Sequence, residues 1–172
     1  MTEEIACETN TFSVFCQSLD KTGLDEKLDR YDSDYTVFVP SNSAFDYFLE
    51  ELEFDDIFDC PDNTLKNVIR QHIVDDHIIY KNDLEDRCGV LLEMDNGENT
   101  RTVCENSGRK LYQKGAGNSE ENIPRIISFN IEACNGIMHV VYRVILPRYV
   151  HSRKSPGKLT ICVALLDRCD FF

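Results

Sequence analysis

Eight cysteines, spread along the whole of this 172-residue chain, constrain its fold more than any other feature of the sequence. No two of them form a Cys-x-x-Cys pair and no histidine lies at zinc-knuckle spacing, so the pattern does not favour a structural zinc site. An even number of cysteines in a domain of this size indicates disulfides and an oxidising compartment, although a cytosolic protein with buried thiols is the alternative. The cysteines that we expect in disulfides are Cys7, Cys60, Cys88, Cys104, Cys134, Cys162 and Cys169. Cys16 is equally compatible with a disulfide and with a packed thiol.

Apolar residues at helical spacing predict three helices in the first half of the chain. Residues 11–24 carry apolar side chains every three or four positions, which predicts a helix, and Gly23 is its expected stop. A second helix is expected after Ser41, because serine is a good N-cap residue. A third is expected to be capped within residues 63–64 and to have an apolar stripe that reaches His72 and Ile73.

Three short runs outside the helices predict strands at 35–39, 126–131 and 137–146. The first and last of these runs end at a proline, which cannot continue a ladder of backbone hydrogen bonds. Together with β-hairpins at 88–114, described next, these elements give the order helix, strand, two helices, hairpins and a final long strand. This order is typical of an α+β fold rather than of an alternating parallel-sheet fold.

Residues 88–114 are interpreted as β-hairpins, because Asn96-Gly97 is a strong turn signal between two β-type runs. Folding the chain about Asn96 brings Cys88 and Cys104 nearly opposite each other. The sequence therefore predicts a disulfide between these two residues.

Charge divides the chain into two parts. Residues 1–147 carry 13 Lys and Arg and 29 Asp and Glu, a net charge of −16, whereas residues 148–172 carry 5 and 2, a net charge of +3. We therefore expect a domain over 1–147 and a basic, cysteine-containing tail over 148–172 that docks on it. The overall charge of −13 disfavours contact with nucleic acid or anionic membranes. No apolar run approaches the roughly 18–20 residues that span a bilayer.

Three segments, in this order, resemble the signature motifs of the fasciclin-like domain family. The first is Tyr-Thr-Val-Phe-Val-Pro-Ser-Asn-Ser-Ala-Phe at 35–45, similar to the family pattern TVFAPTNxAF. The second is Leu-Lys-Asn-Val-Ile-Arg-Gln-His at 65–72, similar to the middle helix that ends in a histidine. The third is Asn-Gly-Ile-Met-His-Val-Val-Tyr-Arg-Val-Ile-Leu-Pro at 135–147, similar to NGVIHVIDRVLLP. The resemblance covers about residues 7–147.

This resemblance implies a fasciclin-like fold, in which a wedge of two β-sheets has several helices packed against it. Family members are mostly extracellular or surface-attached, and their usual role is adhesion or matrix binding without a common catalytic activity. We therefore expect a secreted or cell-surface interaction module, with no cofactor or metal. Its partners are expected to be proteins or polysaccharides of the cell surface or matrix, and it is expected to self-associate weakly. Met1 to Cys7 lack the features of a signal peptide, so a leader is expected to be absent from this sequence.

The resemblance also points to candidate contact residues. Some family members are thought to bind integrins through a Tyr-His pair at the end of the middle helix and an Asp-Ile pair before the Asn-Gly turn. The matching positions here are Gln71-His72 and Asn130-Ile131, so the Tyr and the Asp are missing and an integrin mechanism is not expected. Gln71, His72, Asn130 and Ile131 remain the candidate contact residues, together with the loop 115–122.

Motifs that would indicate an enzyme are absent from the sequence. There is no Gly-x-Ser-x-Gly elbow, no phosphate-binding loop and no His-Glu-x-x-His. The alternative is a small ligand-binding or enzymatic domain that uses His72 or His139 as an acid or base in a cleft. Apolar neighbours around His139 are more typical of a hydrogen-bonded core histidine. A third hypothesis is a structural unit of a longer multidomain chain.

Overall fold

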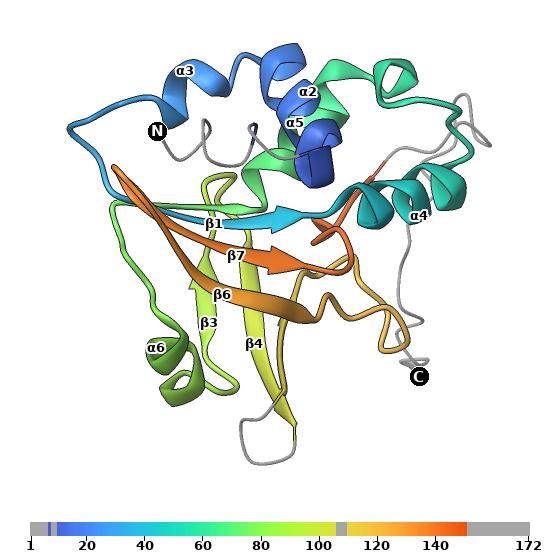
Figure 1. Ribbon diagram of the computed structural model, residues 1–172. Coiled ribbons are helices and arrows are strands. Elements are labelled where there is room, and N and C mark those ends of the chain that lie inside the picture. Colours follow the sequence, from blue (N-terminus) through green and yellow to red (C-terminus); the bar gives the residue numbers. More distant parts are fainter. Residues whose placement is uncertain (1–6, 8–9, 106–109, 151–172) are drawn as a thin grey trace, which may run out of the picture.

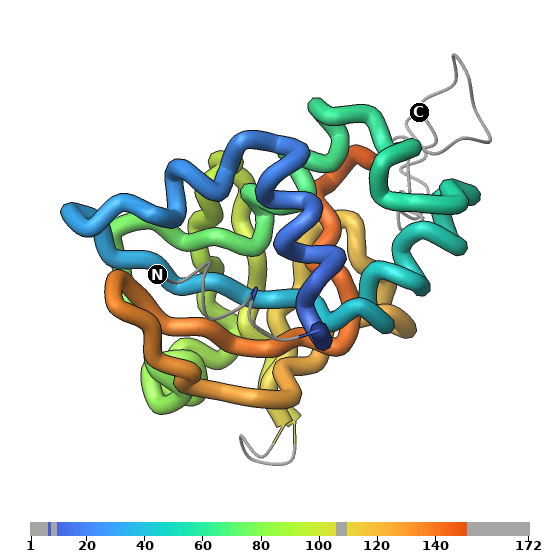
Figure 2. Tube along the Cα trace, turned by 45° about the horizontal axis from the view of Figure 1, so that its top comes forward, coloured from blue at the N-terminus to red at the C-terminus, as the bar shows by residue number. Residues whose placement is uncertain are grey.

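The computed structural model describes Cys7 and residues 10–105 and 110–150, and it has the expected α+β architecture (Figure 1). Helices cover one face of the larger sheet, and a smaller sheet covers the other (Figure 2). The predicted combination of two sheets with several packed helices is therefore confirmed. Cys162, Cys169 and the rest of the expected tail beyond Val150 lie outside the described residues.

The elements occur in the predicted order, with the short elements α3, β2 and α6 added to it. The strands are β1 (Tyr35–Pro40), β2 (Ile73–Asp75), β3 (Leu91–Glu93), β4 (Asn99–Glu105), β5 (Lys110–Lys114), β6 (Ile126–Ala133) and β7 (Gly136–Val141). The helices are α2 (Ser13–Thr22), α3 (Asp25–Leu28), α4 (Asn42–Leu52), α5 (Asp62–Arg70) and α6 (Lys81–Asp86), with 3₁₀ turns η1 (Asn10–Phe12) and η2 (Ile57–Asp59).

β1 is central to the larger sheet, whose strand order is β2-β1-β7-β6. It pairs in parallel with β7, from Tyr35 opposite Gly136 to Pro40 opposite Val141, although the two strands are far apart in the sequence. Every residue of β1 is buried, because one face meets the helices and the other meets the smaller sheet, β3-β4-β5. Burial on both faces explains why this strand is rich in aromatic and β-branched residues and does not alternate between apolar and exposed polar positions.

The apolar core accordingly has one part on each face of β1. Val37 and Val39 face the helices, whereas Phe38 faces the smaller sheet. The largest buried side chains of the part that faces the helices are Tyr35, Phe15, Phe45, Leu19, Leu28, Ile57, Leu65, Ile69 and Ile73. Those of the other part include Phe38, Leu84 and Leu111. Each such side chain contributes about 1.5–3 kcal/mol through its removal from water.

Two of the predicted helix ends are confirmed by their hydrogen bonds. The Ser41 hydroxyl accepts a hydrogen bond from the backbone N–H of Ala44 at 3.3 Å and so caps α4. Gly23 ends α2 in the left-handed region, with φ of 65°, and its N–H donates to the carbonyl of Asp20.

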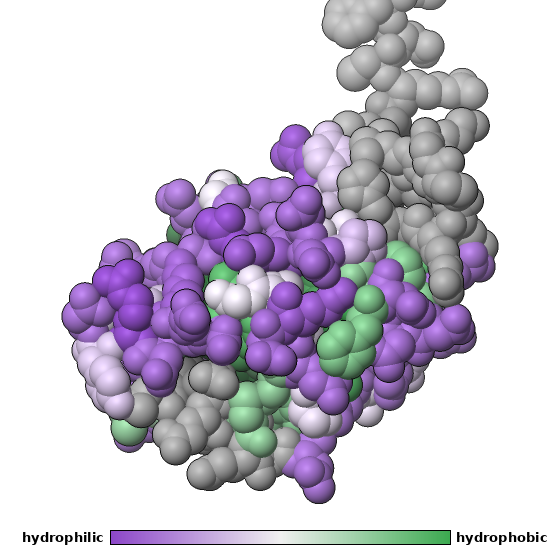
Figure 3. All heavy atoms as spheres, turned by 90° about the horizontal axis from the view of Figure 1, so that it is seen from above, coloured by the Kyte–Doolittle hydropathy of each residue, from purple (hydrophilic) through white to green (hydrophobic). Residues whose placement is uncertain are grey.

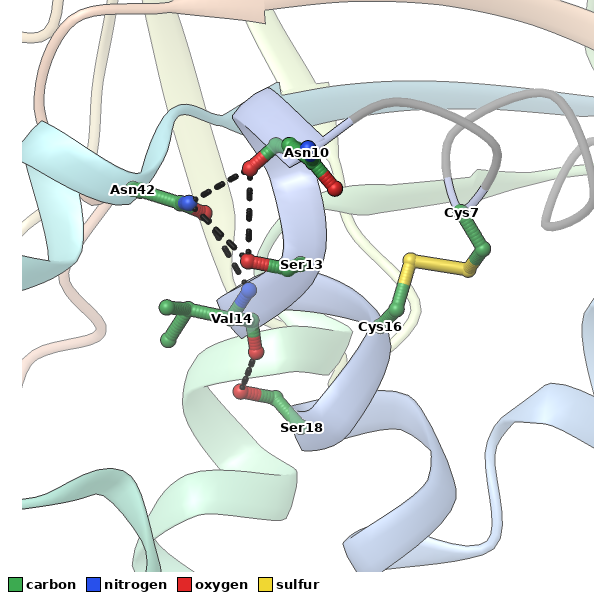
Figure 4. Close-up of a disulfide and its surroundings, with 7 residues drawn as sticks. All are labelled: Cys7, Asn10, Ser13, Val14, Cys16, Ser18 and Asn42. Atoms are coloured by element: carbon green, nitrogen blue, oxygen red, sulfur yellow. Dashed lines mark hydrogen bonds between the residues drawn. A yellow bond between two sulfur atoms is a disulfide. The ribbon is translucent and has the colours of Figure 1, made fainter.

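Asn42, at the start of α4, also caps the neighbouring helix α2 (Figure 4). Its Oδ1 accepts from the N–H of Val14 at 3.1 Å, and its Nδ2 donates to the Asn10 carbonyl at 2.8 Å and the Ser13 hydroxyl at 3.0 Å. The N-cap residue of α2, Phe12, has no side chain that can do this. The amide of Asn42 therefore fixes the N-terminus of α2 against α4.

We expect Asn42→Ala to lower the free energy of unfolding by about 1–2 kcal/mol, because it removes a cap from outside the helix. Urea unfolding followed by circular dichroism measures the change. Asn63→Ala, at an exposed position, is the matched control and should change stability little. Equal effects of the two substitutions would contradict the capping role.

The chain departs from the sequence predictions around the middle helix and after β7. α5 begins at Asp62, after Pro61 rather than after a cap within 63–64, and it ends at Arg70. His72 is therefore not on the helix, and Ile73 belongs to β2, where it pairs with Val37. Sheet pairing has displaced the last turn of the expected helix.

The last strand is also shorter than predicted, because β7 ends at Val141 rather than at 146. The backbone beyond it is held by side chains instead of by a neighbouring strand. The N–H of Ile145 donates to His72, and the N–H of Leu146 and the carbonyl of Val144 bond to Asn118.

Cys88 is disulfide-bonded to Cys104, with their Cα atoms 5.7 Å apart, as the turn at Asn96 predicts. A second disulfide joins Cys7 to Cys16 on α2, with Cα atoms 5.6 Å apart (Figure 4). Cys16 is therefore bridged rather than simply packed.

Contrary to the expectation of disulfides, Cys60 and Cys134 carry free thiols in this structure. Every other cysteine among the described residues is already paired, so neither has a partner there. Cys60 is enclosed in the helical core, and this burial raises the pKa of its thiol to about 11. A thiol that stays protonated is a poor nucleophile.

Candidate interaction surface

Gln71 and His72, two of the candidate contact residues, lie in the interior rather than at the end of an exposed helix. Both are 0% exposed. They occupy the turn between α5 and β2, where the N–H groups of both residues donate to carbonyls of the last turn of α5. Their side chains are not part of the surface that a partner would contact.

The imidazole of His72 is hydrogen-bonded at both nitrogens. Nδ1 donates to the carbonyl of Val68 at 2.7 Å, and Nε2 accepts from the N–H of Ile145 at 2.9 Å. This arrangement fits only the neutral ring, and burial lowers the pKa of His72 to about 4. The side chain joins α5 to the segment after β7.

Gln71 differs from His72, because neither its Oε1 nor its Nε2 has a hydrogen-bond partner although both atoms are buried. Leaving a buried polar group without a partner is costly. The amide therefore destabilises the fold at this position.

We expect Gln71→Met to raise the free energy of unfolding by about 1 kcal/mol, because it replaces an unsatisfied amide with an apolar group of similar volume. Gln113→Met is the matched control. The Gln113 amide is also buried, but it bonds to the hydroxyls of Thr100 and Thr102 at 2.6 and 3.0 Å. This second substitution should be destabilising. Urea unfolding distinguishes the gain of stability expected for Gln71→Met from the loss expected for Gln113→Met. A loss of stability in both variants would contradict an unsatisfied amide at Gln71.

His139 is likewise a core residue, as its apolar neighbours indicate. Its Nε2 donates to the carbonyl of Ile79 at 2.8 Å, and its Nδ1 accepts from the N–H of Asn130. The ring contacts Phe38 and Phe129. Burial lowers the pKa of His139, so the ring is neutral and has no free nitrogen for acid–base chemistry.

Asn130 and Ile131 lie at an irregularity of the β6–β7 pairing, and only Asn130 is exposed. Asn130 has φ of 56°, in the left-handed region that asparagine tolerates better than most residues. Its Oδ1 accepts a hydrogen bond from the N–H of Lys81 at 2.9 Å. Ile131 is half-buried and packs on the helical core. The structure therefore leaves Asn130 as the exposed member of the four candidates.

A hollow of about 320 Å³ lies between α4 and the chain after β7, and we call it the α4 groove. Asn118 and Asn122 of the candidate loop 115–122 line it, but sequence reasoning did not indicate the hollow itself. Arg143 lies over the rings of Tyr47 and Tyr142, 3.6 and 4.5 Å from their centroids. Both tyrosines are partly exposed. Tyr47, Glu50 and Glu51 line the hollow, and the ring of Tyr142 lies beside that of Tyr47. A hydrogen bond with Tyr47 and the charge of Arg143 lower the pKa of Tyr142. Tyrosine and arginine are the residue types that dominate the energetics of protein interfaces.

A second hollow, of about 420 Å³, lies between β2 and β3, and Asp75 and Asp95 on its wall belong to an ion-pair cluster. Lys27 donates to Asp75 and to Asp95, and Nε of Arg70 donates to Asp95 at 2.8 Å. Burial raises the pKa of Asp95, but the hydrogen bonds from Arg70 and Lys27 outweigh it, so the net pKa is lowered. The cluster joins α3 and α5 to the turn after β3. In the part of the chain that the structure describes, no group of three or more His, Cys, Asp or Glu residues is arranged to hold a metal ion.

Viewed from the helical side, the described surface is mostly hydrophilic, with apolar residues in small separate areas (Figure 3). A broad apolar contact patch is therefore not visible on this face. Tyr47 in the α4 groove and the neighbouring Tyr142 are better candidates for a specific contact than the helical face as a whole.

The fold and the positions of the three motifs agree with one protein family. The family model of the fasciclin domain matches residues 10–147, which is most of the chain. The chain belongs to the fasciclin domain family. The match ends at Pro147, so it includes the whole α4 groove but not the basic tail.

Comparison of this fasciclin domain with solved structures supports the same fold. One similar structure is a FAS1 domain pair from the insect cell adhesion molecule fasciclin I, with a TM-score of 0.65 and 16% sequence identity. The match covers 83% of this chain and 49% of that chain, so this chain spans about half the length of the pair. A comparison with curated proteins gives no match.

The helices of this fasciclin domain are short. Among the described residues, none is long and apolar enough to cross a membrane.

Proposed function

We propose that this fasciclin domain is an interaction module of the cell surface or extracellular matrix, which acts in adhesion or matrix organisation. Its mechanism is contact with a protein or polysaccharide rather than turnover of a substrate. The observation that carries the proposal is the fasciclin domain over residues 10–147. The similar fold of an insect cell adhesion molecule supports it.

The two disulfides support an extracellular or cell-surface location. Cys7–Cys16 and Cys88–Cys104 require an oxidising compartment to form and persist. The strong negative charge suits a saline medium, since it favours solubility.

The alternative, an enzyme or ligand carrier that uses His72 or His139, has less support. A general acid or base needs a nitrogen that can reach a substrate. Both nitrogens of each ring are engaged in hydrogen bonds within the domain, and both side chains are 0% exposed. The geometry of these two residues is that of structural histidines.

Immobilised protein tests the proposed function. Wells are coated with the oxidised domain or, as a control, with the same protein reduced, alkylated and unfolded. Attachment of cells, matrix proteins and polysaccharides, and binding of soluble copies of the chain, are then measured. The expected result is attachment to the folded form alone. If the folded form showed none of these contacts, the proposal would be wrong.

Asn130→Gly tests the one exposed residue among Gln71, His72, Asn130 and Ile131. Glycine keeps the positive φ of this position and removes the amide side chain. Reduced attachment with unchanged unfolding would place the contact at the β6–β7 irregularity. Unchanged attachment would exclude Asn130 from the contact and leave the α4 groove and the adjoining loop 115–122 as the remaining candidate surfaces.

A further inference from the structure

The α4 groove continues toward the end of the described chain. Phe48, Glu51 and Leu146 line the hollow beside Tyr47, and the same three residues line a narrower hollow next to it. Arg148 and Val150 form part of the wall of this second hollow. Val150 is the last described residue, so the chain leaves the described structure at the rim of the groove.

One side of the groove belongs to a strongly acidic segment. Residues 46–62 contain eight Asp and Glu and no Lys or Arg, and all eight acidic residues are exposed. Within the described part of the chain, neither Glu50 nor Glu51 forms a salt bridge. A basic segment would therefore find the carboxylates of Glu50 and Glu51 without a cation among the described residues.

The segment that follows Val150 has the complementary charge. Residues 151–158 are His-Ser-Arg-Lys-Ser-Pro-Gly-Lys, with three Lys and Arg and no acidic residue. At about 3.3 Å per residue, eight residues reach roughly 26 Å, whereas the 11-residue helix α4 is about 16 Å long. The segment is thus long enough to follow the whole helix from the point where it starts.

We propose that residues 151–158 occupy the α4 groove of their own chain, with their basic side chains against Glu50 and Glu51. A short tether gives an effective concentration in the millimolar range, so even weak charge pairing gives substantial occupancy. This docking does not require the adhesion role, so a failed attachment assay leaves its test unaffected.

Amide signals of the groove report directly on the occupant. Two-dimensional NMR spectra are recorded for the full chain and for a chain that ends at Val150, which retains the whole matched domain. The expected result is that removal of the tail shifts the signals of Tyr47, Glu50 and Glu51, equally at low and high protein concentration. A synthetic peptide of residues 151–158, added to the shortened chain, should reverse the shifts. Unchanged signals in the groove would overturn the proposal.

Salt and charge reversal separate this docking from other placements of the tail. In about 1 M NaCl the Debye length is only ~3 Å, so the groove signals of the full chain should move toward those of the shortened chain. Glu50→Lys with Glu51→Lys should abolish the salt effect, whereas the matched change Glu26→Lys with Asp29→Lys, on and beside α3, should preserve it. Shifts that grow with protein concentration would show the tail on a second copy and would contradict docking within one chain.

Discussion

Replacing Gly117 with alanine is expected to lower the free energy of unfolding by about 3 kcal/mol. A Cβ atom at this position would lie 2.2 Å from the backbone oxygen of Pro147 and 2.9 Å from Cβ of Leu146. Both contacts are far shorter than van der Waals distance, and the nearer one involves backbone that cannot rotate away. The loop or the segment after β7 must therefore shift.

The shift would be costly because several hydrogen bonds hold these two segments together. The N–H of Gly117 donates to the carbonyl of Leu146 at 3.0 Å. The buried side chain of Asn118 accepts from the N–H groups of Gly115 and Leu146 and donates to the Val144 carbonyl. Moving the loop would break these bonds and leave buried polar groups without partners.

Gly97→Ala is the matched control for this prediction. Gly97 has φ of 80° and nothing within 4 Å of an added Cβ, so its substitution costs only the backbone strain, about 1 kcal/mol. Urea unfolding at neutral pH measures both variants. If Gly117→Ala costs no more than Gly97→Ala, the loop does not lie against residues 146–147 as the structure has it.

Local patterns in the sequence were sufficient for most of the fold. The run at 35–39 forms the central strand β1. Ser41 caps the start of α4 and Gly23 caps the end of α2, as the preferences of serine and glycine predict. These predictions depend on properties of neighbouring residues, which the sequence displays directly. The disulfide between Cys88 and Cys104 followed from a turn between them.

Predictions failed where a distant segment decides the structure. The apolar spacing at 65–73 corresponds to a helix only up to Arg70. Ile73 instead pairs with Val37 of β1, and this pairing is more stable than another helical turn. Strand 137–146 was predicted too long because its last residues bond to His72 and Asn118, which lie far away in the sequence. Neither partner can be recognised from the run itself.

The candidate contact residues show the same division between local pattern and distant contact. The apolar stripe that includes His72 indicated that this side chain is buried, whereas the resemblance to a contact motif indicated that it is exposed. In the structure His72 is buried. The α4 groove is built from α4, the loop 118–122 and the segment 143–146. Only the fold brings these three parts together, so no spacing in the sequence could indicate it.

The second large effect expected is a loss of stability in mild acid that depends on His72. In the unfolded chain a histidine has a pKa of about 6.5, whereas burial lowers the pKa of His72 in the fold to about 4. The unfolded chain therefore binds a proton between these values and the folded chain does not. The stabilisation is fully present above pH 6.5, and about 3 kcal/mol of it is lost as the pH falls to about 4.

Other groups contribute to the same pH profile, so variants must isolate His72. The pKa of His139 is also lowered by burial and adds to the loss in acid. The lowered pKa of Asp95 acts in the same direction at lower pH, whereas the pKa of Asp75 is raised by burial and acts in the opposite direction. A single acid denaturation curve of the native protein cannot separate these contributions.

His72→Gln removes the titrating ring and retains a polar group that can accept the hydrogen bond from the N–H of Ile145. It should lower stability at neutral pH by about 1 kcal/mol, because the bond to Val68 is lost. Between pH 6.5 and 4.5, however, its stability should fall much less steeply than that of the native protein. His77→Gln, at an exposed position, should keep the native slope. Urea unfolding at several pH values gives the three slopes, and a native slope in His72→Gln would contradict the neutral, doubly bonded imidazole in the fold.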